Sequence, residues 1–208
     1  SAIQGVSAVE GIAQQEIEWR LSPTDPWRPA GLSARTDYQD QTLTKYRLIS
    51  GQWPHKKVFG IGQGGDTAFG VHEGDRVYIR VNSRETTITI GSVIYDQIVQ
   101  PPSFGGNAQF YTTLEEFGNL TGSENYNRIF ASTAHYDADQ ATAIANTMQD
   151  KLEKQDLMVG GASPRGGSIA DPNKHFFQDP LDGLFFIMGF MATIALILGG
   201  VAIGTTEF

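Results

Sequence analysis

The chain has 208 residues, 40% of them hydrophobic, and 23 acidic against 15 basic residues give it a formal net charge of −8. This is enough apolar material for one medium domain or two small ones. A nucleic-acid-binding surface needs clustered cations, and the longest basic stretch is residues 55–57, so the composition argues against a nucleic-acid partner. The chain has no cysteine, which excludes disulfides and thiolate chemistry and fits an extracytoplasmic compartment.

The amino-terminal part predicts two strands around a proline-rich loop. Residues 8–20 alternate apolar and polar side chains in their later half, which predicts a strand. Three prolines and a glycine in residues 23–31 predict a loop, and residues 32–38 predict a second strand. Residues 39–57 then lead through a short helix or extended piece into a turn at Pro54.

Residues 75–96 hold the clearest two-strand pattern in the chain. Residues 76–81 and 87–90 alternate apolar side chains with polar or aromatic ones, as half-buried strands do. Residues 82–85 join the two strands as a hairpin turn. The residues at 100–109 are rich in proline and glycine and predict a loop that closes this block.

Beyond this loop the sequence predicts strands that alternate with helices. Strands are expected at 109–113, 127–135 and 157–163. A helix follows Thr113, whose side chain suits the N-cap, and a longer amphipathic helix covers 137–156 with Asp137 or Asp139 as its cap. Strands that alternate with helices in this way predict an α+β fold.

Residues 183–204 form a run of 22 positions without any charge. As a helix this run spans about 33 Å, close to the hydrocarbon thickness of about 30 Å. We therefore predict a transmembrane helix at 183–204, with residues 164–182 as the linker that leads into it. A hydrophobic helix buried inside a soluble domain is the alternative that the run leaves open.

The glycines of residues 60–65, GIGQGG, match the G-x-G-x-x-G pattern of a dinucleotide-binding loop. That function requires a strand before the loop and a long helix after it. Gly70 and Gly74 allow at most one helical turn after the loop, and strand residues follow. The pattern therefore predicts a glycine-rich loop between strands and no nucleotide cofactor.

No constellation of catalytic or metal-ligating residues stands out in the sequence. The histidines are His55, His72, His135 and His175, and they form no H-E-x-x-H or H-x-H motif. His175 has Asp171 and Asp179 four residues to either side, which could hold a metal only on a helix, and the neighbouring prolines oppose one. We therefore expect no catalytic residue, no cofactor-binding residue and no metal site, in a protein that is not an enzyme.

Four stretches carry a family resemblance. They are IQGVSAVEGIA (3–13), RLISGQWP (47–54), the block 66–96 with its Gly74-Asp75 turn, and DPLDGLFFIMGFMATIALILGG (179–200). In order and spacing they resemble the extracytoplasmic, MacB-like periplasmic core domain of FtsX/MacB-type ABC transporter permeases, followed by the second transmembrane helix. Family members carry four membrane helices, so the chain is expected to be a fragment of such a subunit.

The resemblance also implies a fold. It implies a mixed α/β subdomain of βαβ type from residues 1–46 and 105–163, with a β-rich subdomain, 47–104, inserted into it. Together these residues, 1–163, would be the extracytoplasmic core, followed by the linker and one transmembrane helix. At the Gly74-Asp75 turn we expect a positive φ at the glycine and a capping role for the aspartate.

The function implied by the resemblance is that of a non-catalytic permease part at the cell (inner) membrane, with its globular domain periplasmic or extracellular. The implied partners are a cytoplasmic ABC ATPase subunit, a second permease copy in a homodimer, a periplasmic adaptor protein and membrane lipid. The chain would couple ATP hydrolysis by the ATPase to export or to extracytoplasmic mechanical work. The alternative is a single-pass, membrane-anchored extracytoplasmic binding or sensor module, which would have no ATPase partner.

Overall fold

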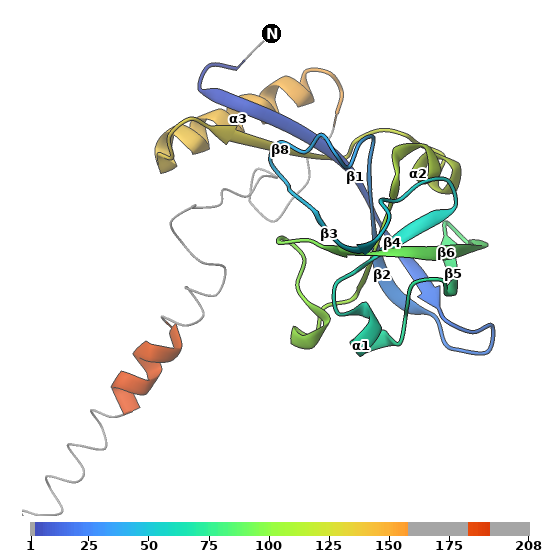
Figure 1. Cartoon of the computed structure of the whole chain (residues 1–208). Helices are drawn as coiled ribbons and strands as arrows, with labels where there is room; N and C mark the ends of the chain where they lie inside the picture. Colours follow the sequence, from blue (N-terminus) through green and yellow to red (C-terminus); the bar gives the residue numbers. More distant parts are fainter. Residues whose placement is uncertain (1–2, 158–182, 192–208) are drawn as a thin grey trace, which may run out of the picture. The chain divides into compact units, whose positions relative to one another are not determined.

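A computed structural model describes residues 3–157 and 183–191 (Figure 1). The chain divides into two compact units, one built on residues 4–134 and the other on residues from 135 onward. The first unit contains an eight-stranded sheet. The second contains the 16-residue helix α3 (Ala138–Glu153).

The sheet of the first unit is formed by strands of 5 to 15 residues. They are β1 (Val6–Arg20), β2 (Arg28–Arg35), β3 (Arg47–Gly51), β4 (Val58–Gly62), β5 (Arg76–Val81), β6 (Arg84–Tyr95), β7 (Ala108–Thr113) and β8 (Arg128–Thr133). The helices between them are short. They are α1 (Gly65–Phe69), the 3-10 helix η1 (Pro102–Phe104) and α2 (Leu114–Thr121).

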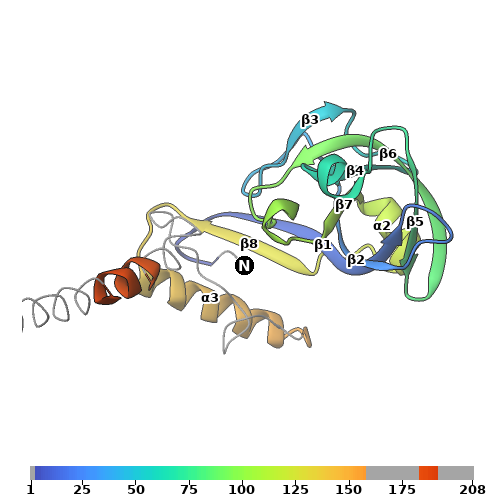
Figure 2. The same ribbon diagram turned by 90° about the horizontal axis from the view of Figure 1, so that it is seen from below.

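Six of the eight strands form a closed ring, and the other two, β3 and β8, lie outside it. The order around the ring is β1, β2, β7, β4, β6, β5 and back to β1. The pairs β2–β7 and β4–β6 are parallel, and the remaining pairs are antiparallel. Strand β6 curves strongly along one side of the ring (Figure 2), and the register of its partners β3 and β4 shifts by one residue against it. Because the ring is closed, each of its six strands pairs with a neighbour on both sides over at least part of its length.

Strand β1 belongs both to the ring and to a ribbon outside it. Its residues 13–19 pair with β2 and residues 18–20 pair with β5, whereas residues 6–12 pair with β8. Figure 1 shows β1 as one continuous strand that passes from the β8 ribbon into the ring. One 15-residue strand therefore connects the two parts of the sheet.

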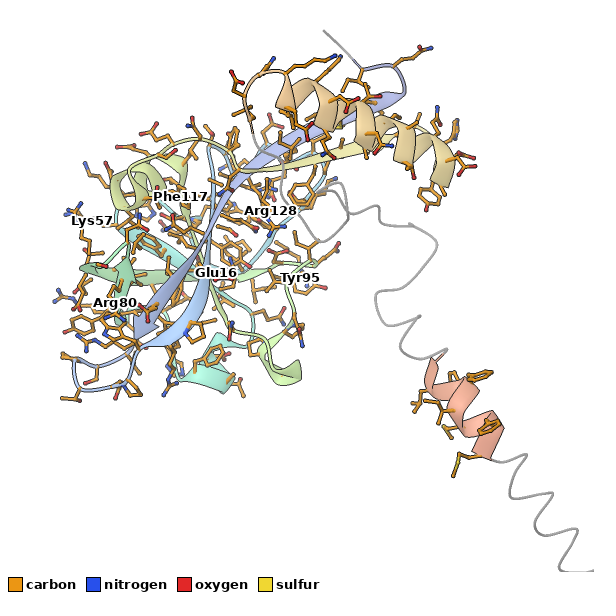
Figure 3. The ribbon with its side chains drawn as sticks, turned by 180° about the vertical axis from the view of Figure 1, so that it is seen from behind. Glu16, Lys57, Arg80, Tyr95, Phe117 and Arg128 are labelled. Atoms are coloured by element: carbon orange, nitrogen blue, oxygen red, sulfur yellow. The ribbon has the colours of Figure 1, made fainter. Side chains whose placement is uncertain are left out.

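The ring encloses an apolar core. Every second residue of β5 is buried, as the alternation in the sequence predicts. Trp19 of β1 is 1% exposed, and its ring meets those of Phe69 and Phe110 edge-on at 5.7 Å. Phe117 of α2 (Figure 3) packs against the same core. Each such fully buried side chain contributes about 1.5–3 kcal/mol to folding.

The hairpin between β5 and β6 is tighter than predicted. Val81 pairs with Arg84, so the turn consists of Asn82 and Ser83 alone and not of residues 82–85. Both turn residues have positive φ, 48° and 67°. Two-residue hairpin turns need this left-handed backbone because it matches the twist of the flanking strands, and asparagine tolerates it well.

Both predicted helix caps are present. The Thr113 hydroxyl accepts a hydrogen bond from the Glu116 N–H at 3.2 Å and begins α2. The Asp137 carboxylate accepts from the Gln140 N–H at 2.8 Å and begins α3, so Asp137 rather than Asp139 is the cap. Each interaction satisfies one of the free amides of the first helical turn.

The predicted strands at 8–20, 109–113 and 127–135 shift by one or two residues at their ends, and the second strand shifts by more, so that it begins inside the predicted loop 23–31. The second strand runs from 28 to 35, whereas residues 32–38 were expected. Pro29 is tolerated because it lies next to the start of the strand, where a missing N–H removes little of the ladder. The predicted strand at 157–163 lies outside the described residues from position 158 onward.

The described chain is a mixed α/β protein with one large mixed sheet. The strands of residues 47–104 share this sheet with those of 1–46 and 105–134, because β5 pairs with β1 and β4 pairs with β7. The predicted boundary between the two subdomains therefore does not coincide with a break in the sheet. The division itself stays a prediction.

Candidate functional site

The start of the predicted membrane run is an exposed apolar helix. Residues 183–191 are helical and carry no charge. Their large apolar side chains are 51–77% exposed, and they are Leu184, Phe185, Phe186, Ile187, Met188, Phe190 and Met191. A contiguous apolar surface of this kind is typical of a segment that is covered by lipid or by another protein.

The remainder of the predicted run, residues 192–204, lies outside the described part of the chain, as does the linker 164–182. Within the described residues, no helix combines the length and the apolar character needed to cross a bilayer.

Residues 60–65 are not one loop between strands, as predicted: residues 60–62 end β4, Gln63 and Gly64 form a turn, and Gly65 begins α1. The prediction that only a short helix follows is confirmed. Gly64 caps α1 with a left-handed backbone, φ 85°, and Gly70 ends the helix in the same way, φ 69°. The helix has five residues, far short of the long helix of a dinucleotide-binding unit. Gly65 packs closely, because a Cβ there would lie 2.5 Å from the Ile61 side chain.

The Gly74-Asp75 turn also has the predicted geometry. Gly74 has φ 90°, and its N–H donates to the Ile90 carbonyl at 2.7 Å. The Asp75 carboxylate accepts from the His72 N–H at 2.7 Å, which closes the turn. The turn therefore leads directly into β5, in the register in which β5 pairs with β6.

A buried ion pair anchors the loop after β2 to strand β1. Arg35 Nη1 lies 2.8 Å from a Glu10 carboxylate oxygen, and the two side chains are 3% and 12% exposed. The Glu10 carboxylate also accepts from the N–H groups of Leu43 and Thr44 at 2.9 and 2.8 Å. Arg35 in turn donates to the Thr44 carbonyl oxygen at 2.5 Å. Glu10 thus holds residues 42–44 through their backbone.

These contacts decide the ionisation of Glu10. Burial raises the pKa of its carboxyl, but the hydrogen bonds from Thr44 and Leu43 and the charge of Arg35 outweigh burial, so the pKa is lowered overall. Glu10 is therefore an anion in the folded protein, and the pair with Arg35 is ionic.

Aromatic rings cover the other side of Arg35. Its guanidinium lies 4.3 Å from the centre of the Tyr46 ring, and Tyr46 meets Tyr111 edge-on at 5.2 Å. Tyr38 stacks on Trp53 at 5.2 Å and donates its hydroxyl to the Thr112 carbonyl oxygen. Burial, with the nearby carboxylate of Asp96 as the next cause, raises the pKa of Tyr46 to about 12. The tyrosines are therefore neutral packing groups at physiological pH.

The histidines are not brought together. His55 lies before β4, His72 before β5 and His135 after β8, and His175 lies outside the described residues together with its two flanking aspartates. In the part of the chain that the structure describes, no group of three or more acidic or histidine side chains is placed to hold a metal ion.

The Glu10–Arg35 anchor is a feature that reasoning from the sequence missed. Its members are 25 residues apart, and the loop at 42–44 has no periodic pattern. The sequence feature that could have indicated the anchor is Arg35 at the end of an apolar strand, because an arginine that is buried there needs a partner.

Neither a protein-family model nor a curated protein sequence matches the chain. Solved structures do match. The extracellular domain of the ABC-type transporter YknZ from Gram-positive bacteria matches with a TM-score of 0.46 and 15% identity, over 72% of this chain and 78% of its own. The periplasmic region of MacB from Actinobacillus actinomycetemcomitans matches with 0.44 and 13%, over 73% and 70%.

A domain described as part of a permease protein from Porphyromonas gingivalis matches with a TM-score of 0.40 and 15% identity, over 72% of this chain and 71% of its own. The chain is thus similar to regions of three bacterial proteins, of which two are extracellular or periplasmic and two are described as a transporter or a permease. The descriptions of the first two, an extracellular domain of an ABC-type transporter and the periplasmic region of MacB, name the kind of domain that the sequence motifs resemble.

Proposed function

We propose that the chain is an extracytoplasmic domain of an ABC transporter permease subunit, held at the membrane by a helix over residues 183–204. One observation carries the proposal. The described start of that helix, 183–191, exposes seven large apolar side chains and no charged one. Such a surface gains free energy in lipid, since leucine, isoleucine and phenylalanine each favour the bilayer centre by about 0.3–0.6 kcal/mol.

The proposed role of the folded domain is mechanical and non-catalytic. A cytoplasmic ATPase subunit would hydrolyse ATP, and a second permease copy, a periplasmic adaptor and lipid would complete the assembly. Strand β1 supports this role, because one continuous strand joins the ribbon at residues 6–12 to the closed ring at residues 13–20. A β-strand is already nearly extended, at about 3.3 Å per residue, so it transmits displacement along its length with little further extension.

Within the core, we propose that residues 47–104 and the rest of 1–163 respond as two subdomains that share one sheet. The linker 164–182 would connect this body to the membrane helix. Motion of the helix would then reach the ring through the chain itself.

The membrane anchor can be tested with single cysteines, because the native chain contains none. Phe186→Cys, on the 77% exposed apolar helix residue, and Thr24→Cys, in the exposed loop after β1, would each be labelled with an environment-sensitive dye. In liposomes we expect the dye at position 186 to shift to the blue and to be quenched by spin-labelled lipid. The dye at position 24 should behave as it does in water. A water-exposed dye at position 186 in liposome-bound protein would refute the anchor.

A second measurement separates the proposed function from the single-pass binding or sensor module. Both readings place residues 183–204 in lipid, but only the permease reading includes an ATPase partner. Affinity capture of the full-length protein from detergent-solubilised native membranes should retrieve an ABC ATPase. Capture without any ATPase would favour the sensor module.

A further inference from the structure

A cavity of about 580 Å³ lies inside the first unit, beside the end of β6. Three segments line it: residues 61–65 and 67–69 from β4 to α1, residues 94–96 and 99–103 at and after the end of β6, and residues 107–109 and 111 of β7 and the turn before it. The volume is within the range of about 300–1,000 Å³ that is typical of small-molecule sites.

The wall of the cavity is mainly apolar. Its larger apolar members are Ile61, Phe69, Ile94, Val99, Pro101 and Pro102. Gly62, Gly64 and Gly65 of the glycine-rich loop also line it and leave space that side chains would fill. The glycine-rich segment that matches the dinucleotide-binding pattern thus borders a mainly apolar cavity.

Among the described residues that line the cavity, Asp96 is the only charged one. One of its carboxylate oxygens accepts from the Ile98 N–H at 3.0 Å, and the other accepts from the Tyr111 hydroxyl at 3.2 Å. A carboxylate has about four acceptor positions, so two remain for a ligand. Asp96 belongs to none of the ion pairs found among the described residues.

The burial of Asp96 also favours a ligand that carries a positive charge. Burial raises the pKa of its carboxyl, and the hydrogen bonds from Ile98 and Tyr111 oppose this rise without cancelling it. The charge of Arg35 also lowers this pKa, but Arg35 is paired with Glu10 and does not line the cavity, so the described lining itself holds no compensating cation. An incoming cation would supply one, whereas a phosphate would meet a negative charge and no lysine or arginine in the lining.

We propose that this cavity binds an amphipathic organic cation, with its apolar part against Ile61, Ile94 and Val99 and its ammonium group on the Asp96 carboxylate. The charge of the lining selects the cation, and the apolar wall selects a hydrophobic body. The site lies within residues 61–111 and does not depend on the membrane anchor.

The test compares three probes of similar size: 3-phenylpropylamine, which is a cation at neutral pH, the neutral 3-phenylpropan-1-ol and the anion 3-phenylpropanoate. Binding to the full chain in detergent would be followed by the chemical shifts of the backbone amides in residues 61–69 and 94–103. We expect the amine to bind about tenfold more tightly than the alcohol, and the anion to bind more weakly than both, as a charge-assisted contact in a partly buried site implies.

Three variants decide the origin of this preference. Asp96→Asn keeps the shape and the hydrogen bond from the Ile98 N–H, and its amide can donate to the Tyr111 hydroxyl instead of accepting from it, but the charge is removed. The amine should then bind no better than the alcohol. Asp66→Asn removes an equal charge from exposed residue 66 of α1, outside the lining, and should leave the preference intact. Ala68→Trp puts a large ring at the wall of the cavity and should weaken the binding of all three probes.

The proposal is overturned by any of three results: no shifts with the amine in the native protein, an amine preference that survives Asp96→Asn, or unchanged binding by Ala68→Trp. Partitioning of the probes into detergent cannot imitate the expected result, because it would be the same for all variants.

Discussion

Replacing Glu10 by glutamine tests the buried anchor between β1 and the loop after β2. The carboxylate accepts from Arg35 at 2.8 Å and from the Leu43 and Thr44 N–H groups at 2.9 and 2.8 Å. Glutamine has nearly the same shape. It removes the charge, however, and turns one acceptor oxygen into an amide nitrogen that faces donors.

The expected loss of unfolding free energy follows from the burial of Arg35, the partner of Glu10. Removing one member of a buried ion pair costs about 3–5 kcal/mol, because the remaining charge stays uncompensated. Arg35 still donates to the Thr44 carbonyl oxygen, and the Glu10 side chain is 12% exposed, so we expect the lower end, about 3 kcal/mol. For a unit of this size that loss lowers the unfolding midpoint by roughly 10 °C.

Urea unfolding of the full chain in mild detergent, followed by tryptophan fluorescence, measures this free energy. The matched control is Glu16→Gln on the same strand (Figure 3), where the side chain is exposed and a change within about 0.5 kcal/mol is expected. The double variant Glu10→Gln/Arg35→Met should recover part of the loss, because no charge is left buried. Equal midpoints for the Glu10 and Glu16 variants would show that the pair does not stabilise the fold.

The same variant has a pH signature. The pKa of Glu10 is lowered in the folded state, so its stabilisation is present above the ordinary value of 4.5 and is lost as the pH falls through the folded-state pKa. The difference in unfolding free energy between the native protein and Glu10→Gln should therefore shrink in acid. A difference that grows in acid would contradict the assigned ionisation.

Three further predictions concern single residues. Thr113→Ala removes the cap of α2 and should cost about 1 kcal/mol in urea unfolding, whereas Thr113→Ser should cost little. Gly74→Ala should cost about 1–2 kcal/mol although a Cβ there has open space, because φ is 90°; no loss would mean that the turn relaxes. Burial raises the pKa of Asp96, so its contribution to stability is full below the ordinary value of 3.8 and is lost as the pH rises through the folded-state pKa. Asp96→Asn should therefore gain stability relative to the native protein between about pH 3 and pH 7 in urea titrations, and a relative loss would contradict this sign.

Local features of the fold could be predicted from the sequence because their causes are local. The alternation of residues 76–81 predicts β5, since every second residue faces the core. Thr113 and Asp137 predict helix starts, because a cap acts within three residues. The short helix after the glycine-rich loop follows from Gly70 in the same way.

Ring closure and the anchor could not be predicted, because they depend on residues far apart in the chain. The ring closes through pairs such as Glu18 with Arg80 and Gly60 with Tyr111. Periodicity shows that a strand exists and which face it buries, but it does not name the partner strand. The acidic cavity residue Asp96 was missed for the same reason, since its surroundings come from three separate segments.

Glu10 lies on β1 close to the residue where β1 changes from one partner strand to another. It lies in the ribbon half of β1, opposite Phe130 of β8, yet its carboxylate is held by Arg35 of β2 and by the loop that follows β2. The anchor thus ties the ribbon to the ring next to the point where β1 changes partners. Backbone pairing alone would leave that point free to bend, because residues 6–12 and 13–19 belong to different ladders. In the proposed permease, loss of the anchor would therefore weaken transmission along β1 at the point where the strand changes partners.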